Sequence, residues 1–262
     1  MEPAVEFRHA SFFSGEYIIL DNISLRIPKN QFTVIMGTSG SGKSTLLKAA
    51  AGIIAPDKGT LLVDDSDIAM LPENKLYELR KKGGFVFQDA ALWANKNLWD
   101  NLELPLRVAK PGISINEIAE KIQSHIERFQ FRDELSLRPA NLSSGEKKII
   151  SIIRGIITEP QRLYLDEPLA SLDRASVDRL LNLLSEYRKS GRTIIAVTHN
   201  EKLTSSLADY LIVLKEGSVL TSGSFNEVKE TKDPEVIEVI SEVLGETATY
   251  DQDILHLLDD SI

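Results

Sequence analysis

The sequence predicts an α/β fold in which a largely parallel sheet is covered by helices. Short, continuously apolar runs such as FTVIM (32–36) and TIIAV (193–197) are typical of strands buried on both faces. Helical patterns alternate with these runs along the chain, and this order favours strand–helix–strand units. A stretch of helical character from about 90 to 155 predicts a separate helical lobe.

The first half of the chain indicates strands around one early helix. Residues 4–35 carry alternating and apolar segments between Ser-Gly, Pro and Asn, which indicates short strands joined by turns. TLLKAAAG (45–52) predicts a helix that stops at Gly52. Further elements are expected as a strand at GTLLVDD (59–65), a short helix or turn at KLYELRKK (75–82) and a strand at GFVFQ (84–88).

The second half continues this alternation and includes a hairpin. INEIAEKIQSHIERF (115–129) places apolar residues three and four apart, as one face of a helix requires. DYLIVLKEGSVLTSG (209–223) predicts a hairpin with its turn at Glu216-Gly217. The remaining elements are expected as strands at RLYLDEP (162–168) and TIIAVTHN (193–200), with a helix at ASVDRLLNLLSEYRKSG (175–191).

The composition limits the possible chemistry. The 262 residues are 42% hydrophobic and 26% charged, which is ordinary for a globular protein. The sequence contains no cysteine, so disulfides, thiolate nucleophiles and cysteine-bound metal clusters are excluded. The N-terminus lacks the pattern of a secretory signal, and no apolar run approaches the roughly 20 residues of a membrane span. We therefore expect a cytoplasmic protein.

The net charge of −9 is concentrated at one end of the chain. Residues 226–262 hold eleven acidic and two basic side chains, a balance of −9, so the rest of the chain is neutral. Proteins that bind nucleic acid usually carry a basic face. A neutral body with an acidic tail therefore argues against a nucleic-acid partner.

GTSGSGKST (37–45) matches the pattern G-x-x-x-x-G-K-[ST] of a phosphate-binding loop. Its glycines allow successive backbone N–H groups to face one concavity, and the following helix adds the positive end of its dipole. Lys43 is expected to reach the β- and γ-phosphates of a nucleotide, and the Ser44 hydroxyl to ligate Mg²⁺. The expected nucleotide-binding residues of the loop are Gly37, Thr38, Ser39, Gly40, Ser41, Gly42, Lys43, Ser44 and Thr45.

Two carboxylates follow a second apolar strand, in LYLDEP (163–168). The carboxyl end of a buried strand is where α/β sheets bind ligands. Together with the phosphate loop, this position predicts that Asp166 holds Mg²⁺, directly or through water. Glu167 is then placed to polarise an attacking water as general base.

NLSSGEKKII (141–150) has the sequence of a capped helix start. Ser143 followed three residues later by Glu146 fits the capping box, in which each side chain satisfies a free backbone donor. The run Ser-Ser-Gly is not needed for a cap, and Gly145 weakens the first turn. This stretch is therefore a candidate for binding an anion at a helix N-terminus.

Taken together, these motifs resemble the ATP-binding cassette (ABC) ATPases over about residues 4–225. LSSGE resembles the family's signature motif, which is usually LSGGQ. The motifs occur in the family's order, as Walker A (37–45), the Q-loop glutamine Gln88, the signature (142–146), Walker B with the catalytic glutamate (163–167), the D-loop SLD (171–173) and the switch histidine His199.

The resemblance implies the architecture and the roles of these residues. The core would be a P-loop NTPase fold with a mixed parallel sheet, an antiparallel N-terminal β subdomain and an inserted helical signature subdomain. The ATPase domain would span 1–225, with the helical part at about 90–155, and an acidic extension would span 226–262. Gln88 would touch Mg²⁺ and the attacking water, and His199 would act beside Lys43 in charge neutralisation.

The resemblance also implies an aromatic residue that stacks on adenine. The candidates are Phe12, Phe13 and Tyr17, and the position relative to LDNISL favours Phe13. Packing on a strand face is the alternative for all three.

The chain departs from the family's pattern at the signature. Ser144 replaces a glycine, where its side chain would either crowd a phosphate or add a hydrogen bond. Glu146 replaces glutamine, and as a capping-box residue it can point back to the Ser143 N–H instead of toward phosphate.

In this family two subunits bind head to tail around two ATP molecules with Mg²⁺. The resemblance thus implies a second copy of the chain as a partner, with Ser143, Ser144 and Gly145 of one copy contacting the γ-phosphate held by the other. Hydrolysis would drive a separate integral membrane permease. The chain would then lie peripherally on the cytoplasmic face of the inner membrane.

GFVFQDAALWANKNLWDNLELPLR (84–107) resembles the ATPases of Mla-type phospholipid and other Mce-associated lipid transporters, whose partners include Mce-type substrate-binding proteins. DPEVIEVISEVLG (233–245) resembles the segment after the core in such ATPases. Its apolar spacing predicts packing through Val236, Ile237, Ile240, Val243 and Leu244. The last stretch, DQDILHLLDDSI (251–262), is expected either to dock or to be disordered.

Other functions share this cassette. One alternative is a soluble ATPase of iron–sulfur cluster assembly, and another is an exporter ATPase for a different substrate. A DNA-repair or chromosome-type ATPase is disfavoured because fewer than 100 residues separate Thr45 from Leu142, too few for long coiled-coil arms.

Overall fold

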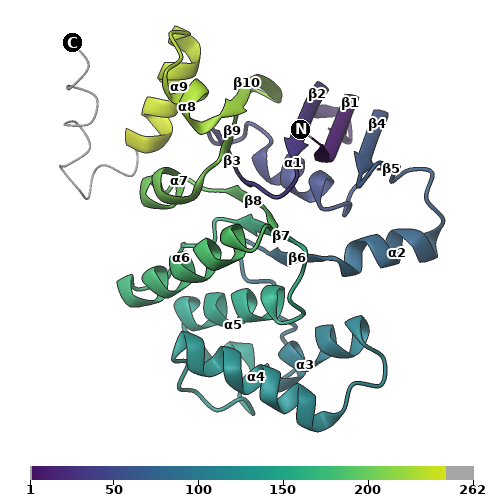
Figure 1. Ribbon diagram of the computed structural model, residues 1–262, viewed down its shortest axis with the longest axis vertical. Helices are drawn as coiled ribbons and strands as arrows, with labels where there is room; N and C mark the ends of the chain where they lie inside the picture. The colour runs from purple at the N-terminus through teal and green to yellow at the C-terminus, as the bar shows by residue number, and fades with distance from the viewer. Residues whose placement is uncertain (1, 246–262) are drawn as a thin grey trace.

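The computed structural model of the chain describes residues 2–245, and Figure 1 shows two sheets with a group of helices at one end. Residues 246–262, which include the end of the expected acidic extension, lie outside the described residues. The architecture confirms the α/β fold expected from the alternating strand and helix patterns.

The smaller sheet is antiparallel and is built mainly from the N-terminal strands. Its order is β2-β1-β4-β5, and every neighbouring pair runs antiparallel. These strands are β1 (Pro3–Ser14), β2 (Tyr17–Pro28), β4 (Lys58–Val63) and β5 (Ser66–Asp67).

The larger sheet has six strands in the order β10-β9-β3-β8-β7-β6. All of its neighbours are parallel except β9 and β10, which form the hairpin expected around Glu216-Gly217. Both turn residues have positive φ, 47° and 76°, as a tight hairpin turn requires. The strands are β3 (Phe32–Gly37), β6 (Gly83–Val86), β7 (Arg162–Asp166), β8 (Thr193–Val197), β9 (Tyr210–Lys215) and β10 (Ser218–Ser224).

The central strands of the larger sheet, β3, β8 and β7, are buried on both faces, and alternate side chains point to the two sides. In β3, Val34 and Met36 belong to a first apolar cluster, whereas Ile35 belongs to a second one on the opposite face of the sheet. The second cluster fills the space between the two sheets, where α1 (Lys43–Ala50) lies. Tyr164 also points into this cluster and is 2% exposed, so its ring is buried and does not lie at the surface.

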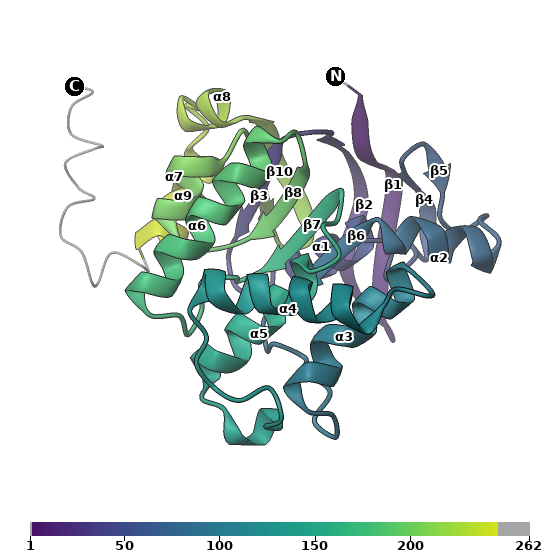
Figure 2. The same cartoon turned by 60° about the horizontal axis from the view of Figure 1, so that its bottom comes forward.

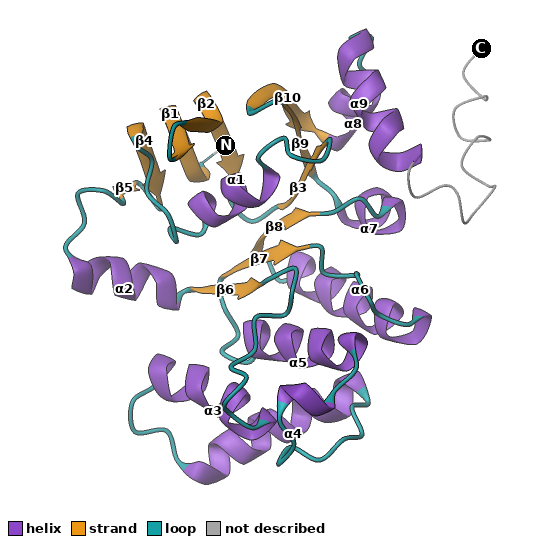
Figure 3. Ribbon diagram, turned by 180° about the vertical axis from the view of Figure 1, so that it is seen from behind, coloured by secondary structure: helices purple, strands orange, loops and turns teal. Residues whose placement is uncertain are grey.

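A helical lobe stands beyond the β6 edge of the larger sheet (Figures 1 and 2). Its elements are α3 (Leu98–Ala109), α4 (Ile115–Phe129), the 3-10 turn η1 (Pro139–Asn141) and α5 (Ser144–Ile156). Figure 3 shows these helices gathered at one end, away from the antiparallel sheet. The lobe shares the first apolar cluster with the sheet, because Ile150 and Ile153 of α5 pack in that cluster with Val86 of β6.

The other helices flank the sheets, and the last two of them, α8 and α9, end the described part of the chain. They are α2 (Glu73–Lys81), α6 (Arg174–Lys189), α7 (Glu201–Leu207), α8 (Phe225–Lys229) and α9 (Pro234–Gly245). In α9, Val236, Val239 and Val243 are each 1% exposed and join the first apolar cluster. Ile237, which the sequence analysis assigned to the packing face, is 46% exposed, because the buried stripe follows spacings of three and four residues that leave it outside.

Candidate functional site

The phosphate loop connects β3 to α1, as the sequence pattern requires. Two of its glycines are needed because the backbone passes close to other segments. A Cβ at Gly37 would lie 2.3 Å from Leu214 O, and one at Gly42 would lie 2.5 Å from Leu20 Cδ2. Gly42 also has φ 94°, which disfavours any residue with a side chain. The loop is therefore held in its tight course by strands β2 and β9.

Lys43 folds back over this loop. Its Nζ donates hydrogen bonds to Gly37 O and Thr38 O, both at 2.7 Å, and the residue is 8% exposed. An ammonium held against the loop backbone can neutralise an anion bound in the same concavity. The arrangement fits the phosphate-binding role expected for Lys43.

Ser44 and Asp166 meet although they lie far apart in the sequence. Ser44 Oγ donates to Asp166 Oδ1 at 3.2 Å, which joins the start of α1 to the end of β7. Hydroxyl and carboxylate oxygens are ligands that Mg²⁺ prefers, and Mg²⁺ commonly binds through one or two protein groups together with substrate phosphates. Residues 2–245 contain no cluster of three His, Cys, Asp or Glu that could hold a metal alone. The donor set fits a nucleotide-bound Mg²⁺.

Glu167 lies directly after β7, in an unusual backbone conformation. Its φ is 43°, uncommon for a residue with a side chain, and its N–H donates to Val197 O at 2.9 Å. This bond holds the carboxylate beside the end of β8. Glu167 Oε1 lies 3.3 Å from His199 Nε2.

The surroundings of Glu167 change its acidity. Burial raises the pKa of Glu167 to about 7, and a hydrogen bond from the His199 backbone acts in the opposite direction. A carboxyl group with a pKa near the working pH is suited to accept a proton from water. The structure therefore brings the candidate base Glu167 within 3.3 Å of the candidate histidine His199, as measured between Oε1 and Nε2.

Gln88 follows β6 and is exposed at its side chain. Its backbone carbonyl accepts a hydrogen bond from Lys148 Nζ at 3.1 Å. The Q-loop, the segment 87–97 that joins β6 to α3, thus starts at the same carboxyl edge of the sheet as the phosphate loop, Asp166 and His199, because parallel strands end there together.

The signature segment confirms the capping box expected from the sequence. Glu146 Oε2 accepts from the Ser143 N–H at 2.7 Å and from Ser143 Oγ at 2.6 Å, and the Glu146 N–H donates to Ser143 Oγ at 3.3 Å. These hydrogen bonds lower the pKa of Glu146. In the described part of the chain, the side-chain hydrogen bonds of Ser143 therefore stay within its own helix start.

The other two signature residues differ in their surroundings. Ser144 is exposed at the first position of α5. A Cβ at Gly145 would lie 2.7 Å from Ser171 O, so the D-loop backbone passes directly against this glycine. The structure therefore explains the glycine at position 145, and it leaves the Ser144 side chain facing solvent.

The three aromatic candidates for adenine stacking are separated by burial. Phe12 is 3% exposed and packs edge-to-face on Phe7, so packing explains this residue. Tyr17 is 78% exposed at the β1–β2 turn. Phe13 is half-buried, with Lys58 Nζ 5.3 Å from its ring centroid. Adenine stacking by Phe13 stays a prediction.

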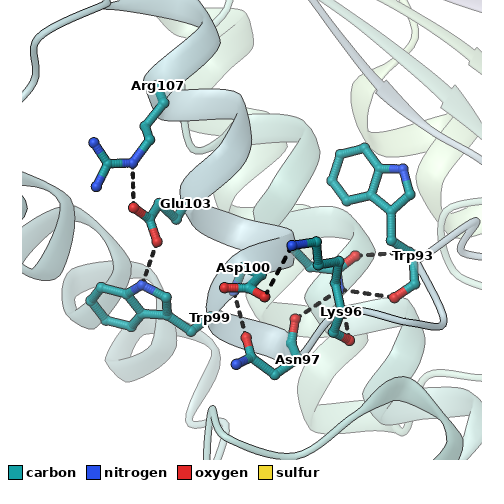
Figure 4. A network of polar contacts seen from close by, with 8 residues as sticks. Trp93, Lys96, Asn97, Trp99, Asp100, Glu103 and Arg107 are labelled. Atoms are coloured by element: carbon teal, nitrogen blue, oxygen red, sulfur yellow. Dashed lines mark hydrogen bonds and ion pairs between the residues drawn. The ribbon is translucent and has the colours of Figure 1, made fainter.

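Three residues that hold the Q-loop were missed by the sequence analysis. Lys148 and Arg154 of α5 donate to its backbone carbonyls, and Asn101 of α3 binds both the N–H and the C=O of Trp93. Their signal in the sequence was a polar side chain within the apolar pattern of a helix; Asn101 and Lys148 are buried, and Arg154 is partly exposed. Figure 4 shows the far end of the loop, where Trp93 and Asn97 approach the start of α3.

An apolar groove runs beside the Q-loop and has a volume of about 560 Å³. It lies between α2, β6 and the helical lobe, and the lining includes Tyr77, Phe87, Trp93, Val108 and Arg154. Tyr77 and Trp93 are 47% and 41% exposed. The groove therefore presents aromatic surface next to the segment that carries Gln88.

Comparisons with known proteins agree with this geometry. A sequence model described as ABC transporter matches residues 20–170. The chain is 34% identical to the intermembrane phospholipid transport system ATP-binding protein MlaF of Escherichia coli (strain K12), over 88% of this chain and 86% of that protein. It is 32% identical to the methionine import ATP-binding protein MetN of Histophilus somni (strain 129Pt), over 80% of this chain but 60% of that protein.

Among solved structures, the chain resembles the ATP-binding cassette MJ0796 in a dimeric post-hydrolysis state bound to ADP and Pi. The TM-score is 0.76 at 28% identity, and the match covers 84% of this chain and 98% of that one. Within residues 2–245, no helix has both the length and the apolar character that crossing a membrane would require. The chain belongs to the ABC transporter family as an ATPase subunit, which binds ATP with Mg²⁺ and couples ATP hydrolysis to transport.

Proposed function

We propose that two copies of this chain bind head to tail around two ATP molecules and drive a separate membrane permease that moves phospholipid. In each site one copy supplies the phosphate loop and the Mg²⁺ ligands, and the other copy supplies the signature. The residues assigned to the nucleotide are Phe13, Gly37 to Thr45, Ser143, Ser144 and Gly145. Ser44, Asp166 and Gln88 are assigned to Mg²⁺, and Lys43, Gln88, Glu167 and His199 to hydrolysis.

The exposed signature supports the head-to-tail arrangement. Ser143 and Ser144 are exposed at the N-terminus of α5, and within residues 2–245 the side-chain hydrogen bonds of Ser143 are confined to its own capping box. A helix N-terminus with small residues can bind an anion through free N–H groups. A two-fold axis then forms two equal sites from one pair of surfaces. The phosphate that approaches Ser143 would thus come from the second copy.

Hydrolysis would depend on positioning and charge neutralisation. Lys43 and a Mg²⁺ held by Ser44 and Asp166 would stabilise the charge on the transferred phosphoryl group. Glu167 would accept a proton from the attacking water, and its raised pKa supports that role. His199 would orient the carboxylate and contact the γ-phosphate.

The groove beside the Q-loop supports the coupling to a permease. Exposed aromatic surface at Tyr77 and Trp93 is the kind of surface that binds a partner helix. Movement of a helix seated there would reach Gln88 through the Q-loop backbone. This would place the chain peripherally on the cytoplasmic face of the inner membrane.

The observation that carries the phospholipid assignment is the near full-length match to MlaF, which covers 88% of this chain and 86% of that protein. The match to the methionine import protein covers a smaller share of that protein, 60%. We therefore rank a methionine-type substrate second, behind phospholipid. The lipid assignment implies Mce-type substrate-binding proteins among the partners.

Purification of the native complex tests this proposal. The tagged chain is isolated from its own membranes in mild detergent, and the co-purifying proteins and lipids are identified by mass spectrometry. We expect an integral membrane protein and enriched phospholipid, with ATPase activity that phospholipid stimulates and that Glu167→Gln abolishes. A soluble complex without a membrane protein, or stimulation by an amino acid instead of lipid, would contradict the proposal.

A further inference from the structure

A buried lysine on α5 joins the Q-loop to the end of β7. Lys148 is 2% exposed, and its Nζ donates to Phe87 O at 2.9 Å, Gln88 O at 3.1 Å and Asp166 O at 3.3 Å. An ammonium has three N–H donors, and three carbonyls accept them here. A buried ammonium is stable only when it is hydrogen-bonded in this way.

Two of the carbonyls that accept from this ammonium belong to candidate site residues, Gln88 and Asp166. Gln88 and Asp166 both lie at the carboxyl edge of the sheet, after β6 and at the end of β7. Lys148 binds the backbone of both, so it sets the distance between the two segments that present these side chains. Lys148 itself lies on α5, whose first turn contains the signature residues. The lysine therefore connects both segments to the signature helix.

A second cation on the same helix fixes the next part of the Q-loop. Arg154 donates to Ala90 O at 3.0 Å and to Ala91 O at 2.8 Å, and its guanidinium lies 5.2 Å from the Trp93 ring centroid. Ala90 and Ala91 have φ of 65° and 48°, a conformation that residues with side chains rarely adopt. The loop is therefore held in an unfavourable course by α5, and Lys148 holds the part that includes Gln88.

We propose that Lys148 is a positioning residue for ATP hydrolysis, which holds the carbonyls of Gln88 and Asp166 at one point so that the Gln88 side chain faces the metal and the attacking water. This inference rests on the role proposed above for Gln88. It goes beyond that role, because it assigns the placement of Gln88 to a residue of the signature helix. A signature helix that shifts would then carry Gln88 with it.

The alternative is that Lys148 only stabilises the fold. The two explanations differ in what they change. A stabilising residue would alter thermal stability, and its loss would add to the loss of any catalytic group. A positioning residue would alter kcat while leaving nucleotide affinity in place, and its effect would vanish once Gln88 is absent.

The first measurement compares Lys148→Met with Lys147→Met. Lys147 neighbours Lys148 on α5 but is more exposed, and its side chain makes no hydrogen bond to the other residues of the described range 2–245, so it is a matched control. We expect Lys148→Met to lower kcat by roughly 10- to 100-fold, as a displaced catalytic group does. The Kd for ATP should change by less than about threefold, because the phosphate loop is intact. Lys148→Arg, which keeps the charge and the donors, should recover a large part of kcat.

The second measurement is a double-mutant cycle with Gln88→Ala. If Lys148 acts through Gln88, adding Lys148→Met to Gln88→Ala lowers kcat by less than about twofold further. If Lys148→Met does not fold, Lys148→Gln, which keeps N–H donors without the charge, replaces it in the same cycle. Thermal unfolding of each variant shows whether it is folded.

The outcomes separate this inference from the proposed role of Gln88. A fully active Gln88→Ala would contradict the role of Gln88 itself. An impaired Gln88→Ala beside an unaffected Lys148→Met, or an additive double variant, would overturn only the role of Lys148. Equal losses in Lys147→Met and Lys148→Met would also overturn it.

Discussion

His199 Nε2 lies 3.3 Å from Glu167 Oε1, and the two residues follow neighbouring parallel strands, β8 and β7. The Glu167 N–H is bonded to Val197 O, so the contact is held by the backbone as well as by the side chains. Burial of the Glu167 carboxyl group in this arrangement raises its pKa to about 7. The chemistry of the site therefore depends on how the ends of two strands are aligned.

Glu167→Gln should remove hydrolysis and keep ATP binding. Loss of a general base lowers a rate by roughly 10²- to 10⁴-fold. In the wild type, kcat should fall as the pH decreases below about 7, because the carboxylate must be deprotonated to act as base. Steady-state ATPase assays from pH 6 to 9 measure both effects. A rate near wild type for Glu167→Gln would sink the assignment of the base.

The same group predicts how stability depends on pH. Because the folded pKa of Glu167 is raised from 4.5 to about 7, its contribution to stability is full below about 4.5 and is lost as the pH rises through 7. Glu167→Gln cannot titrate, so the wild type should lose stability relative to the variant between pH 5 and 8, by at most on the order of 3 kcal/mol. Urea unfolding of both proteins at several pH values measures the difference, and parallel curves would contradict the prediction.

The contact between Ser44 and Asp166 predicts the dependence on Mg²⁺. Ser44→Ala removes one oxygen of the pair that lies at 3.2 Å, so the Mg²⁺ concentration for half-maximal ATPase should rise roughly tenfold or more. Binding of ATP measured in EDTA should stay unchanged, since Lys43 and the loop are intact. An unchanged Mg²⁺ requirement would remove Ser44 from the metal site.

The signature predicts an effect between copies. Ser143→Arg should abolish hydrolysis by the dimer while a single copy still binds ATP, because a long cation would block the approach of the second copy. Ser136→Arg is a matched control, since Ser136 is exposed elsewhere in the same lobe. Equilibrium ATP binding and ATPase assays give the two readouts. If Ser143→Arg lost ATP binding, the action across the interface would be wrong.

The packing of α9 predicts whether residues after 225 are part of the folded body. Val239 is 1% exposed within the first apolar cluster, so Val239→Ala should lower the free energy of unfolding by about 1–2 kcal/mol. Ile237→Ala on the same helix, at 46% exposure, should change it by less than about 0.5 kcal/mol. Equal effects in denaturant unfolding would show that α9 is not packed in this way. The division of the chain at 225 stays a prediction until this is measured.

Local sequence rules predicted most elements because each depended on neighbouring residues. The phosphate loop, the Ser143–Glu146 capping box and the Glu216-Gly217 turn are specified by backbone geometry within a few residues. The alternation of apolar runs and helical patterns predicted the parallel sheet. The packing face of α9 was predicted less well, because periodicity alone cannot say which of several apolar residues meets the sheet.

The sequence by itself determined the motifs, their order and the chemical groups available, since these depend on residue type and spacing. Only the tertiary structure decided which of these groups meet. Lys148 contacts Gln88 and Asp166, and Gly145 lies against Ser171, because strand order and helix packing bring distant segments together. The burial that raises the pKa of Glu167 has the same origin, because the dielectric surroundings of a group depend on everything packed around it and not on its neighbours in the chain.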